Sequence, residues 1–306
     1  MIFFDDEQPP HKPVMLGEVI DFIRPGVGDV IVDATVGAGG HSCEILKMIG
    51  SDGLLIGIDK DAEILKIAHK YLSRISKSYK LYHADYTDLN YILSELKISR
   101  VQGILLDLGV SSLQLDSLER GFSFSKEGPL DMRMDRSKGL TAEELLKKLS
   151  QKEMEDIFWR YGEERWSRSI ARTISQERRR GGNIKTTTQL AKIVEKALYT
   201  SRKLPKKRKI HPATRVFQAL RIVVNDELKS LEYFINNVHE FLASGSRIVV
   251  ISFHSLEDRL VKRAFLKGQT TSSLKILTKK PLRSHDSEIR ENIRCRSAKL
   301  RAAERT

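Results

Sequence analysis

Short apolar runs alternate with amphipathic helical patterns between residues 14 and 110, and this alternation constrains the fold more than any other feature. Runs of the length of buried strands lie at 30–36, 54–58, 80–83 and 103–106. Helical patterns lie at 14–23, 45–49, 61–75 and 89–96. Strands and helices in regular alternation are typical of βαβ units, which build a parallel sheet covered by helices on both faces.

The pattern changes between about residues 115 and 210, where we expect no strand. Helices are predicted there at 141–149, 152–159, 164–179 and 187–198, the first with a capping box formed by Thr141 and Glu144. From 211 onward the sequence predicts helices at 212–225, 227–242 and 256–266, and strands at 247–252, 275–278 and 298–302. We therefore expect one doubly wound, mostly parallel α/β domain, residues 1–114 and 211–306, interrupted by an all-helical insert at 115–210.

The overall composition favours a polyanionic partner. The 306 residues contain 53 Lys and Arg against 40 Asp and Glu, a net charge of +13, which suits RNA, DNA or an anionic membrane surface. Because no long apolar run is present, we expect no transmembrane helix, and the acidic first 13 residues do not resemble a signal peptide. Cys43 and Cys295 offer neither a disulfide framework nor a metal-ligand cluster. A cytoplasmic, metal-free protein is expected.

A glycine-rich turn follows the first predicted strand, where residues 30–42 have the sequence VIVDATVGAGGHS. Glycines allow tight dihedrals and close approach of the backbone to a ligand. A dinucleotide-binding fingerprint, G-x-G-x-x-G, would need a third glycine where Ser42 stands. Asp33 on the strand suits a cationic or hydroxyl-rich ligand. These two features favour S-adenosylmethionine over NAD, although a plain strand-to-helix turn remains the alternative.

The next two strands end in residues that suit an adenosine. Asp59 ends the second strand, where an acid can accept hydrogen bonds from both ribose hydroxyls. Proteins that bind NAD place an acid similarly, so Asp59 indicates a ribose and not a particular cofactor. Asp61 is better explained as a helix N-cap. Tyr86 follows the third strand, where it could flank an adenine ring, although an isolated aromatic of this kind is more often core.

Asp107 ends the fourth predicted strand, within GILLDLGVSSLQ at 103–114. Ligands bind outside the carboxyl ends of strands in open α/β sheets, so Asp107 is expected to point toward the site, unless it only caps the strand. Methyltransferases that modify amines usually carry an acid or amide here. The exocyclic amine of cytosine is a poor nucleophile, and acceptors for its N–H groups can align it. Neither cysteine has the Pro-Cys context expected for the nucleophile of cytosine C5 methylation.

Several stretches together resemble one family, the bacterial 16S rRNA cytosine-N4 methyltransferases of the RsmH/MraW type. They are HKPVML at 11–16, DATVGAGGHS at 33–42, GILLDLGVSS at 103–112, RGFSF at 120–124, GPLDMRMD at 128–135, YGEER at 161–165, HPATRVFQALR at 211–221 and ISFHSLEDR at 251–259. The matches extend over nearly the whole chain. Leu113 departs from the family pattern, which commonly has proline before the glutamine.

The resemblance implies a Rossmann-like fold and methyl transfer from S-adenosylmethionine to N4 of a cytidine in the decoding centre of 16S rRNA. It implies 16S rRNA or the small ribosomal subunit as the partner, a substrate-recognising role for the insert, and allows a homodimer. By position, the cofactor-binding residues would be Gly39, Gly40, His41, Asp59, Tyr86, Asp107 and Gln114. The catalytic candidates are Asp107 and His254, because His254 follows the predicted strand at 247–252.

Three basic stretches are candidates for contact with RNA: residues 201–212, the arginines at 178–180, and the tail at 279–305. Most charge runs are only solvated loops. Candidates for contact with a base are Phe122, Phe124, Phe253 and His254. Two other functions compete with the methyltransferase: an NAD-dependent oxidoreductase, which Ser42 disfavours, and a non-catalytic RNA-binding assembly factor, which the acids Asp33, Asp59 and Asp107 disfavour.

Overall fold

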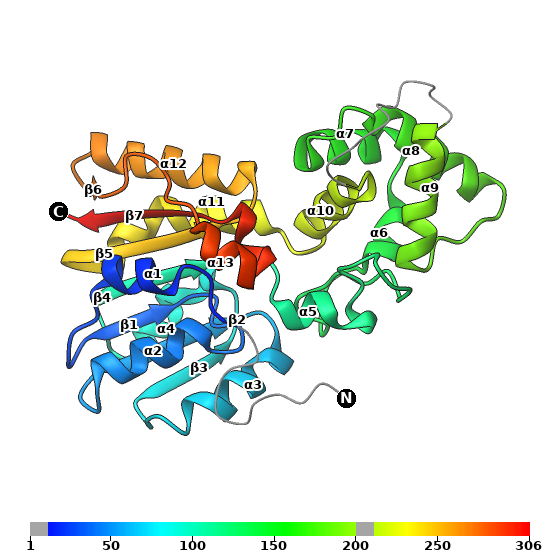
Figure 1. Ribbon diagram of the computed structural model, residues 1–306. Helices are drawn as coiled ribbons and strands as arrows, with labels where there is room; N and C mark the ends of the chain where they lie inside the picture. Colours follow the sequence, from blue (N-terminus) through cyan, green and yellow to red (C-terminus); the bar gives the residue numbers. More distant parts are fainter. Residues whose placement is uncertain (1–11, 200–210) are drawn as a thin grey trace. The chain divides into compact units, whose positions relative to one another are not determined.

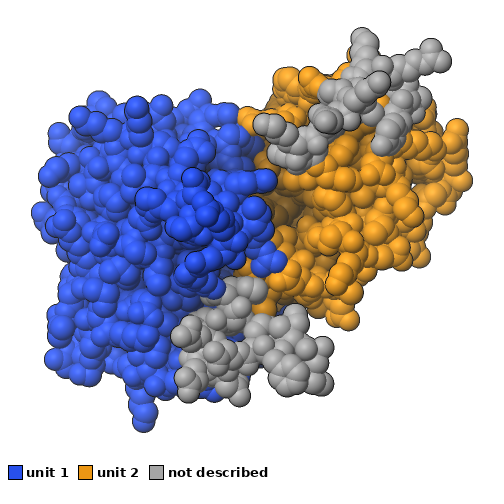
Figure 2. All heavy atoms as spheres, viewed as in Figure 1, with its two compact units in different colours: residues 1–109, 228–306 blue, residues 110–227 orange. Residues whose placement is uncertain are grey.

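The computed structural model describes residues 12–199 and 211–306, and the chain divides into two compact units. Unit 1 contains residues 1–109 and 228–306, and unit 2 contains residues 110–227; Figure 2 colours them separately. Among the described residues, no helix has both the length and the apolar character that would let it span a membrane.

Unit 1 contains a seven-stranded sheet with the order β3-β2-β1-β4-β5-β7-β6 (Figure 1). The strands are β1 (Val30–Asp33), β2 (Leu54–Asp59), β3 (Tyr79–His83), β4 (Val101–Asp107), β5 (Leu242–Ser252), β6 (Leu274–Ile276) and β7 (Lys299–Arg305). Strands β1 to β5 pair in parallel, whereas β7 is antiparallel to both β5 and β6. The expected doubly wound, mostly parallel sheet is confirmed.

Helices cover both faces of this sheet. Those of unit 1 are α1 (Leu16–Ile23), α2 (Gly40–Ile49), α3 (Ala62–Leu72), α4 (Leu89–Glu95), α11 (Glu227–Asn237), α12 (Ser255–Thr270) and α13 (Asp286–Glu291). Successive side chains of a strand point to opposite faces, so Ile104 and Leu106 pack in one core with α4, α11 and α12. Leu105, between them, packs in the other core with α1, α2 and α3. Burial on both faces explains why these strands are nearly continuous apolar runs.

The register of the central strands places three acids at one edge of the sheet. Asp33 pairs with Gly57, two residues before Asp59, and Asp107 continues the β4 ladder beside β1. Strand β1 lies between β2 and β4, so the chain reverses its direction of winding at β1. The crevice beyond the carboxyl ends of strands at such a switch point is where doubly wound sheets bind ligands.

Unit 2 is built from helices, as expected for the insert. They are α5 (Ser112–Asp116), α6 (Ala142–Lys148), α7 (Gln151–Gly162), α8 (Ser167–Arg179), α9 (Thr187–Tyr199) and α10 (Ala213–Val224). The predicted capping box of Thr141 and Glu144 begins α6. The chain divides at 109 and 227, not at 114 and 210, because Val216, Phe217 and Leu220 of α10 are buried with α7, α8 and α9 in one core.

The end of α11 and the start of β5 differ from the prediction. The helix was expected to continue to 242 and the strand to begin at 247, whereas α11 ends at Asn237 and β5 begins at Leu242. The pairing with β4 shifts from Val101 with Leu242 to Gly103 with Arg247, which leaves a bulge. Gly245 lies in this bulge with φ of +78°. A bulge interrupts the alternation of apolar and polar residues by which a strand is detected in sequence.

Unit 2 depends on a close approach between α7 and α10. A Cβ on Gly162 would lie 2.6 Å from the carbonyl oxygen of Arg215. We expect Gly162→Ala to lower the free energy of unfolding of unit 2 by about 1–3 kcal/mol, because the backbone of α10 must shift. Both tryptophans of the chain lie in unit 2, so urea unfolding followed by tryptophan fluorescence measures this loss.

Gly17→Ala is the matched control, since Gly17 also lies in a helix but an added Cβ would have no atom within 4 Å. Alanine there should leave the fluorescence midpoint unchanged and stabilise α1 by roughly 0.5–1 kcal/mol, measured by circular dichroism. Equal effects of the two substitutions would contradict the importance of the contact between α7 and α10.

Candidate functional site

Asp33, the last residue of β1, is a buried carboxyl with only 1% of its surface exposed. The Ser42 hydroxyl donates to Oδ2 at 2.7 Å and the Thr35 backbone N–H donates to Oδ1 at 3.3 Å. Burial raises the pKa of Asp33 to about 6, against the opposing effect of these two hydrogen bonds. Asp33 is therefore a carboxyl whose negative charge is only partly compensated by the protein.

Asp59, the last residue of β2, holds the glycine turn in place. Its Oδ2 accepts the backbone N–H of Gly37 at 2.9 Å, and its Oδ1 accepts that of Asp61 at 2.9 Å. Burial raises the pKa of Asp59 to about 6. Asp61 caps α3 by accepting from the backbone N–H groups of Glu63 and Ile64, as the sequence predicts. Asp59 thus links the ends of β1 and β2 at the site.

Asp107 ends β4 beside these two acids. Its backbone N–H donates to Thr35 Oγ1 at 2.6 Å, which fixes the end of β4 against the turn after β1. The side chain keeps 25% of its surface exposed, but Oδ1 is buried and has no hydrogen-bond partner among the described residues. Burial raises the pKa of Asp107 well above its ordinary value, and the charges of Asp33 and Glu257 raise it further. An acceptor of this kind is suited to a ligand that donates N–H groups or carries positive charge.

The Gly-Gly-His segment at the start of α2 lies against both Asp107 and the segment before α1. His41 is 5% exposed, and its Nε2 donates to the carbonyl oxygen of Val14 at 2.8 Å. Its Nδ1 lies 3.8 Å from Asp107 Oδ2. Burial lowers the pKa of His41 to about 4, so the ring is neutral and its Nδ1 lone pair faces the carboxyl. Gly39 has φ of +89°, a conformation that side chains disfavour, and a Cβ on Gly40 would meet Pro13 at 3.2 Å.

Tyr86 lies beyond the end of β3 and is 8% exposed. Its ring packs edge-on against Phe234, with 5.2 Å between ring centroids, and the Lys60 ammonium lies 5.8 Å from its centroid. Lys60 also pairs with Asp85 at 2.6 Å. These contacts account for Tyr86 as a core residue next to the site, and its contact with an adenine stays a prediction.

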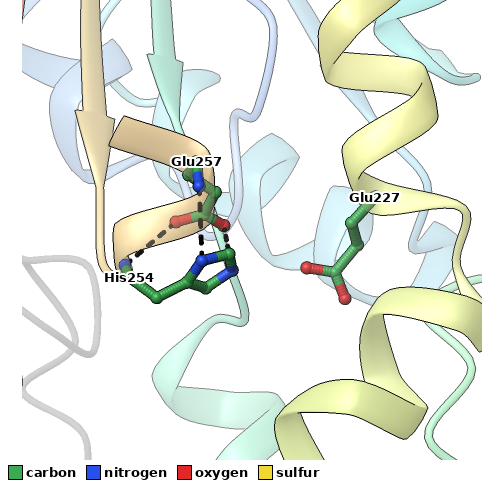
Figure 3. Close-up of side chains that lie close together, drawn as sticks. All are labelled: Glu227, His254 and Glu257. Atoms are coloured by element: carbon green, nitrogen blue, oxygen red, sulfur yellow. Dashed lines mark hydrogen bonds and ion pairs between the residues drawn. The ribbon is translucent and has the colours of Figure 1, made fainter. Parts of the chain in front are cut away.

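His254 lies at the carboxyl end of β5, as expected, and begins α12 as its N-cap (Figure 3). Its Nδ1 accepts the backbone N–H of Glu257 at 3.3 Å, and Glu257 Oε2 accepts the backbone N–H groups of Phe253 and His254. The His254 Nε2 lies 3.1 Å from Glu257 Oε1. Glu227, also drawn in Figure 3, is the last residue of unit 2 and pairs there with Arg221. His254 thus has the geometry of a helix cap, and its catalytic role stays a prediction.

Gln114 is the one predicted cofactor-binding residue that belongs to unit 2. It is 4% exposed and forms a capping box with Ser111: its Oε1 accepts the Ser111 backbone N–H at 2.9 Å, and its own N–H donates to Ser111 Oγ. Leu113, where the family commonly has proline, leaves this cap intact. The other six predicted cofactor-binding residues belong to unit 1.

Two candidates for contact with a base are packed inside unit 2. Phe122 is 7% exposed. Phe124 packs against Phe217, with 4.8 Å between ring centroids, and against His211 at 4.6 Å. Phe253 is partly buried against the core of unit 1. These rings are accounted for by packing.

The basic stretches that are candidates for contact with RNA differ in whether the structure describes them and in whether their charges are paired. Most of the run at 201–212, including the four basic residues at 206–209, lies outside the described residues. In the tail, Lys299 and Arg301 belong to β7, an inner strand, and both pair with Asp258, at 3.1 and 2.6 Å. These two charges are therefore paired within unit 1, and contact of the tail with RNA stays a prediction.

Sequence reasoning assigned no role to three residues that build the site. Ser42 served only as evidence against a third glycine, yet its hydroxyl holds Asp33. Thr35 joins the ends of β1 and β4. Glu257 adds negative charge near Asp107, and it was detectable as an acid three residues after a possible N-cap, the spacing of a capping box.

The doubly wound sheet with a glycine turn after β1 and acids ending β1, β2 and β4 is a Rossmann-like fold, and the match to a methylase family places the chain among the S-adenosylmethionine-dependent methyltransferases with this fold. Residues 8–306 match the MraW methylase family, and the chain belongs to that family.

Relatives of nearly equal length support this assignment. A protein of Thermotoga neapolitana named ribosomal RNA small subunit methyltransferase H is 49% identical over 296 residues, covering 96% of this chain and 95% of the relative. A protein of the same name from Halothermothrix orenii is 46% identical over 310 residues, covering 96% and 98%. An rRNA methylase of Streptococcus thermophilus, 8% identical, aligns over 95% of this chain and 93% of its own, with a TM-score of 0.43, too distant to support an argument.

The raised pKa of Asp33 predicts a pH-dependent stability. The folded pKa is about 6 against 3.8 for an unperturbed carboxyl, so the folded protein holds the proton more tightly. The contribution of Asp33 to stability is therefore greatest below pH 4, falls as the pH rises from about 4 to 6, and is constant above. Asp33→Asn removes this titration, so the variant should gain roughly 1–3 kcal/mol relative to wild type between pH 4 and pH 7.

Urea unfolding of both proteins at pH 4.5, 6 and 7.5 measures this gain. Groups distant from Asp33 cancel in the difference, since both proteins contain them, whereas the loss of the Asp33 charge also lowers the raised pKa of Asp107 and so adds to the gain of the variant. Asp52→Asn, which alters an exposed carboxyl, is the control and should show a difference that does not change with pH. A pH-independent difference for Asp33→Asn as well would contradict the uncompensated charge at this position.

Proposed function

We propose that this protein transfers a methyl group from S-adenosylmethionine to N4 of a cytidine in the decoding centre of 16S rRNA. Its relatives bear the name of a small-subunit ribosomal RNA methyltransferase, which supports ribosomal RNA as the substrate. One observation supports an amine as the methylated group: the buried Oδ1 of Asp107 is an acceptor without a partner among the described residues.

Asp107 would act by aligning the amine and accepting its proton. The N4 lone pair of cytosine is delocalised into the ring, so the amine reacts only when it is held in line with the methyl group. S-adenosylmethionine would supply that methyl group on a sulfonium, whose bond to the methyl group breaks as N4 bonds to it, with the electron pair leaving on sulfur. As N4 forms its new bond, its N–H groups become more acidic, and a carboxylate that accepts one of them stabilises the developing positive charge. Asp107 then takes the proton that N4 must lose.

The cysteines of the chain do not suit the alternative chemistry of cytosine C5. Cys43 is buried on α2, and burial raises the pKa of its thiol to about 11. A thiol in this state is a poor nucleophile at neutral pH. Cys295 is also buried, and its sulfur lies 2.9 Å from the carbonyl oxygen of Asn292. Methylation of an amine needs no covalent intermediate and so no such thiol.

The residues at the carboxyl edge fit a cationic, hydroxyl-rich cofactor. Asp33 and Asp107 are buried carboxyls whose charge the protein compensates at most in part, and they lie where a sulfonium and an ammonium would be stabilised. Asp59 retains free lone pairs for ribose hydroxyls, and a Cβ at Gly37 would find only one atom, a backbone oxygen at 3.9 Å, within 4 Å. The cofactor-binding set we propose is Gly39, Gly40, His41, Asp59, Tyr86, Asp107 and Gln114.

Three further assignments belong to this proposal. The helical unit 2 recognises the substrate, His254 assists near the target base, and the enzyme works in the cytoplasm, where ribosomal RNA is found. A homodimer stays a prediction.

Asp59→Ala should weaken the binding of S-adenosylmethionine by about 1.5–3 kcal/mol, because the ribose loses a charged acceptor and the Gly37 turn loses its anchor. Isothermal titration calorimetry measures the affinity. Asp52→Ala, which removes an exposed acid of the same unit, is the control and should bind as wild type does. Unchanged affinity in a folded Asp59→Ala protein would remove Asp59 from the cofactor site.

The wild-type enzyme should place one methyl group on N4 of a cytidine when incubated with 16S rRNA or small subunits, as mapped by mass spectrometry. Asp107→Ala should reduce the single-turnover rate roughly 100-fold or more. It should not reduce the free energy of unfolding, since Oδ1 has no hydrogen bond to lose. Methylation at carbon, or a full rate in the variant, would refute the proposed role of Asp107.

A further inference from the structure

Helix α8 presents a row of arginines on its exposed side. Its buried side is formed by Ser167, Ile170, Ala171 and Ile174, at the spacing of one helical face. Arg168, Arg172 and Arg179 are exposed, and at 100° per residue they fall within a narrow arc on the other side of the helix, together with Gln176. We call Arg168, Arg172 and Arg179 the α8 stripe.

The stripe has no acidic partner among the described residues. No Asp or Glu lies three or four positions from Arg172 or Arg179. Glu164, four residues before Arg168, is only 1% exposed. Its Oε1 accepts the Trp166 backbone N–H at 2.9 Å, and its Oε2 lies 3.9 Å from Arg215 Nη1. The guanidinium groups of the stripe are therefore not used to hold unit 2 together.

The neighbouring basic residues, in contrast to the stripe, form hydrogen bonds or ion pairs that hold unit 2 together. Arg178 donates from both terminal nitrogens to the carbonyl oxygens of Leu149 and Lys147, each at 2.6 Å. Arg180 and Lys196 both pair with Glu177, at 3.7 and 2.6 Å. Of the three consecutive arginines at 178–180, only Arg179 belongs to the stripe.

The chemistry of the stripe suits phosphodiesters. Arginine is always charged, binds phosphate through two parallel hydrogen bonds, and is more weakly hydrated than lysine. Residues four apart, such as Arg168 and Arg172, are separated by about 6 Å along the helix and repel each other, so a chain of anions would relieve an unfavourable arrangement. Unit 2 contains 26 Lys and Arg against 16 Asp and Glu, so it carries +10 of the net +13 of the chain.

We propose that Arg168, Arg172 and Arg179 form a binding surface for the phosphate backbone of the RNA substrate. The proposal rests on the proposed function, since it names the part of unit 2 that holds the RNA. Contacts to phosphates position a nucleic acid without reading its bases. The stripe therefore contributes affinity that depends on salt and not on the identity of the target base.

The test is a triple variant, Arg168→Gln, Arg172→Gln and Arg179→Gln, in the full-length protein. Glutamine keeps the helix propensity and a polar side chain but removes the charge. Its affinity for purified 16S rRNA should fall at least about ten-fold, and the slope of log affinity against log salt should become shallower by about 2 to 3, for three lost phosphate contacts. The affinity for S-adenosylmethionine and the circular dichroism spectrum should match those of wild type.

A matched control removes three positive charges of unit 2 that already have partners. Lys138, Lys147 and Lys152 pair with Asp135, Glu143 and Asp156, at 3.2, 2.6 and 3.0 Å. Replacing all three by Gln changes the net charge equally. If only net charge mattered, the two triple variants would bind RNA alike, whereas the stripe predicts a smaller change of slope in the control.

The outcomes separate this inference from the proposed function. If wild type methylates 16S rRNA but both triple variants show the same slope, the stripe is overturned and the methyltransferase stands. If the stripe variant loses affinity for small subunits but not for purified rRNA, the stripe binds a ribosomal protein and the inference is wrong. If wild type neither binds nor methylates 16S rRNA, the proposed function and the stripe fall together.

Discussion

The parallel pairing of β1 with both β2 and β4 is the constraint on which the whole site depends. Three strands that end at one edge of the sheet place Asp33, Asp59 and Asp107 near one another although they are separated by 74 residues in the sequence. Two backbone links then fix the edge: the Gly37 N–H to Asp59 and the Asp107 N–H to Thr35. Without these two hydrogen bonds, the glycine turn and the end of β4 would not be held at fixed positions in the site.

This arrangement places more negative charge at the edge than the protein neutralises. Burial raises the pKa of Asp33 and Asp59 to about 6, and burial together with the charges of Asp33 and Glu257 raises that of Asp107 well above its ordinary value. Such a site destabilises the free protein above pH 6 and is stabilised by a positively charged ligand. The same free energy that weakens the empty fold therefore becomes available for binding a sulfonium or an ammonium, which is a physical reason for a carboxyl-rich edge in a methyltransferase.

The sequence could predict the sheet and its acids because both depend on local patterns. Continuous apolar runs reveal strands that are buried on both faces, and an acid at the end of each run needs only the rule about carboxyl ends to be placed. The start of β5 escaped prediction because the bulge at Gly245 interrupts the alternation of side chains. The end of unit 2 escaped it because α10 is an ordinary amphipathic helix, and only packing against α7 and α9 decides which unit it joins. Domain limits, unlike strands, are set by partners distant in sequence.

The basic residues show most clearly what a sequence alone leaves open. Arg178, Arg179 and Arg180 are consecutive and chemically identical, so no pattern of residue types distinguishes them. In the structure, one guanidinium binds the carbonyl oxygens that end a neighbouring helix, one pairs with an acid on its own helix, and one has no acidic partner among the described residues. The helix assigns these roles, since each step of 100° turns the next side chain toward a different neighbour. An arginine that stabilises a fold cannot also give up its hydrogen bonds to a phosphate without cost. If unit 2 binds RNA as we propose, its affinity for phosphates is therefore determined by which of its arginines the fold leaves unused, and not by how many it contains.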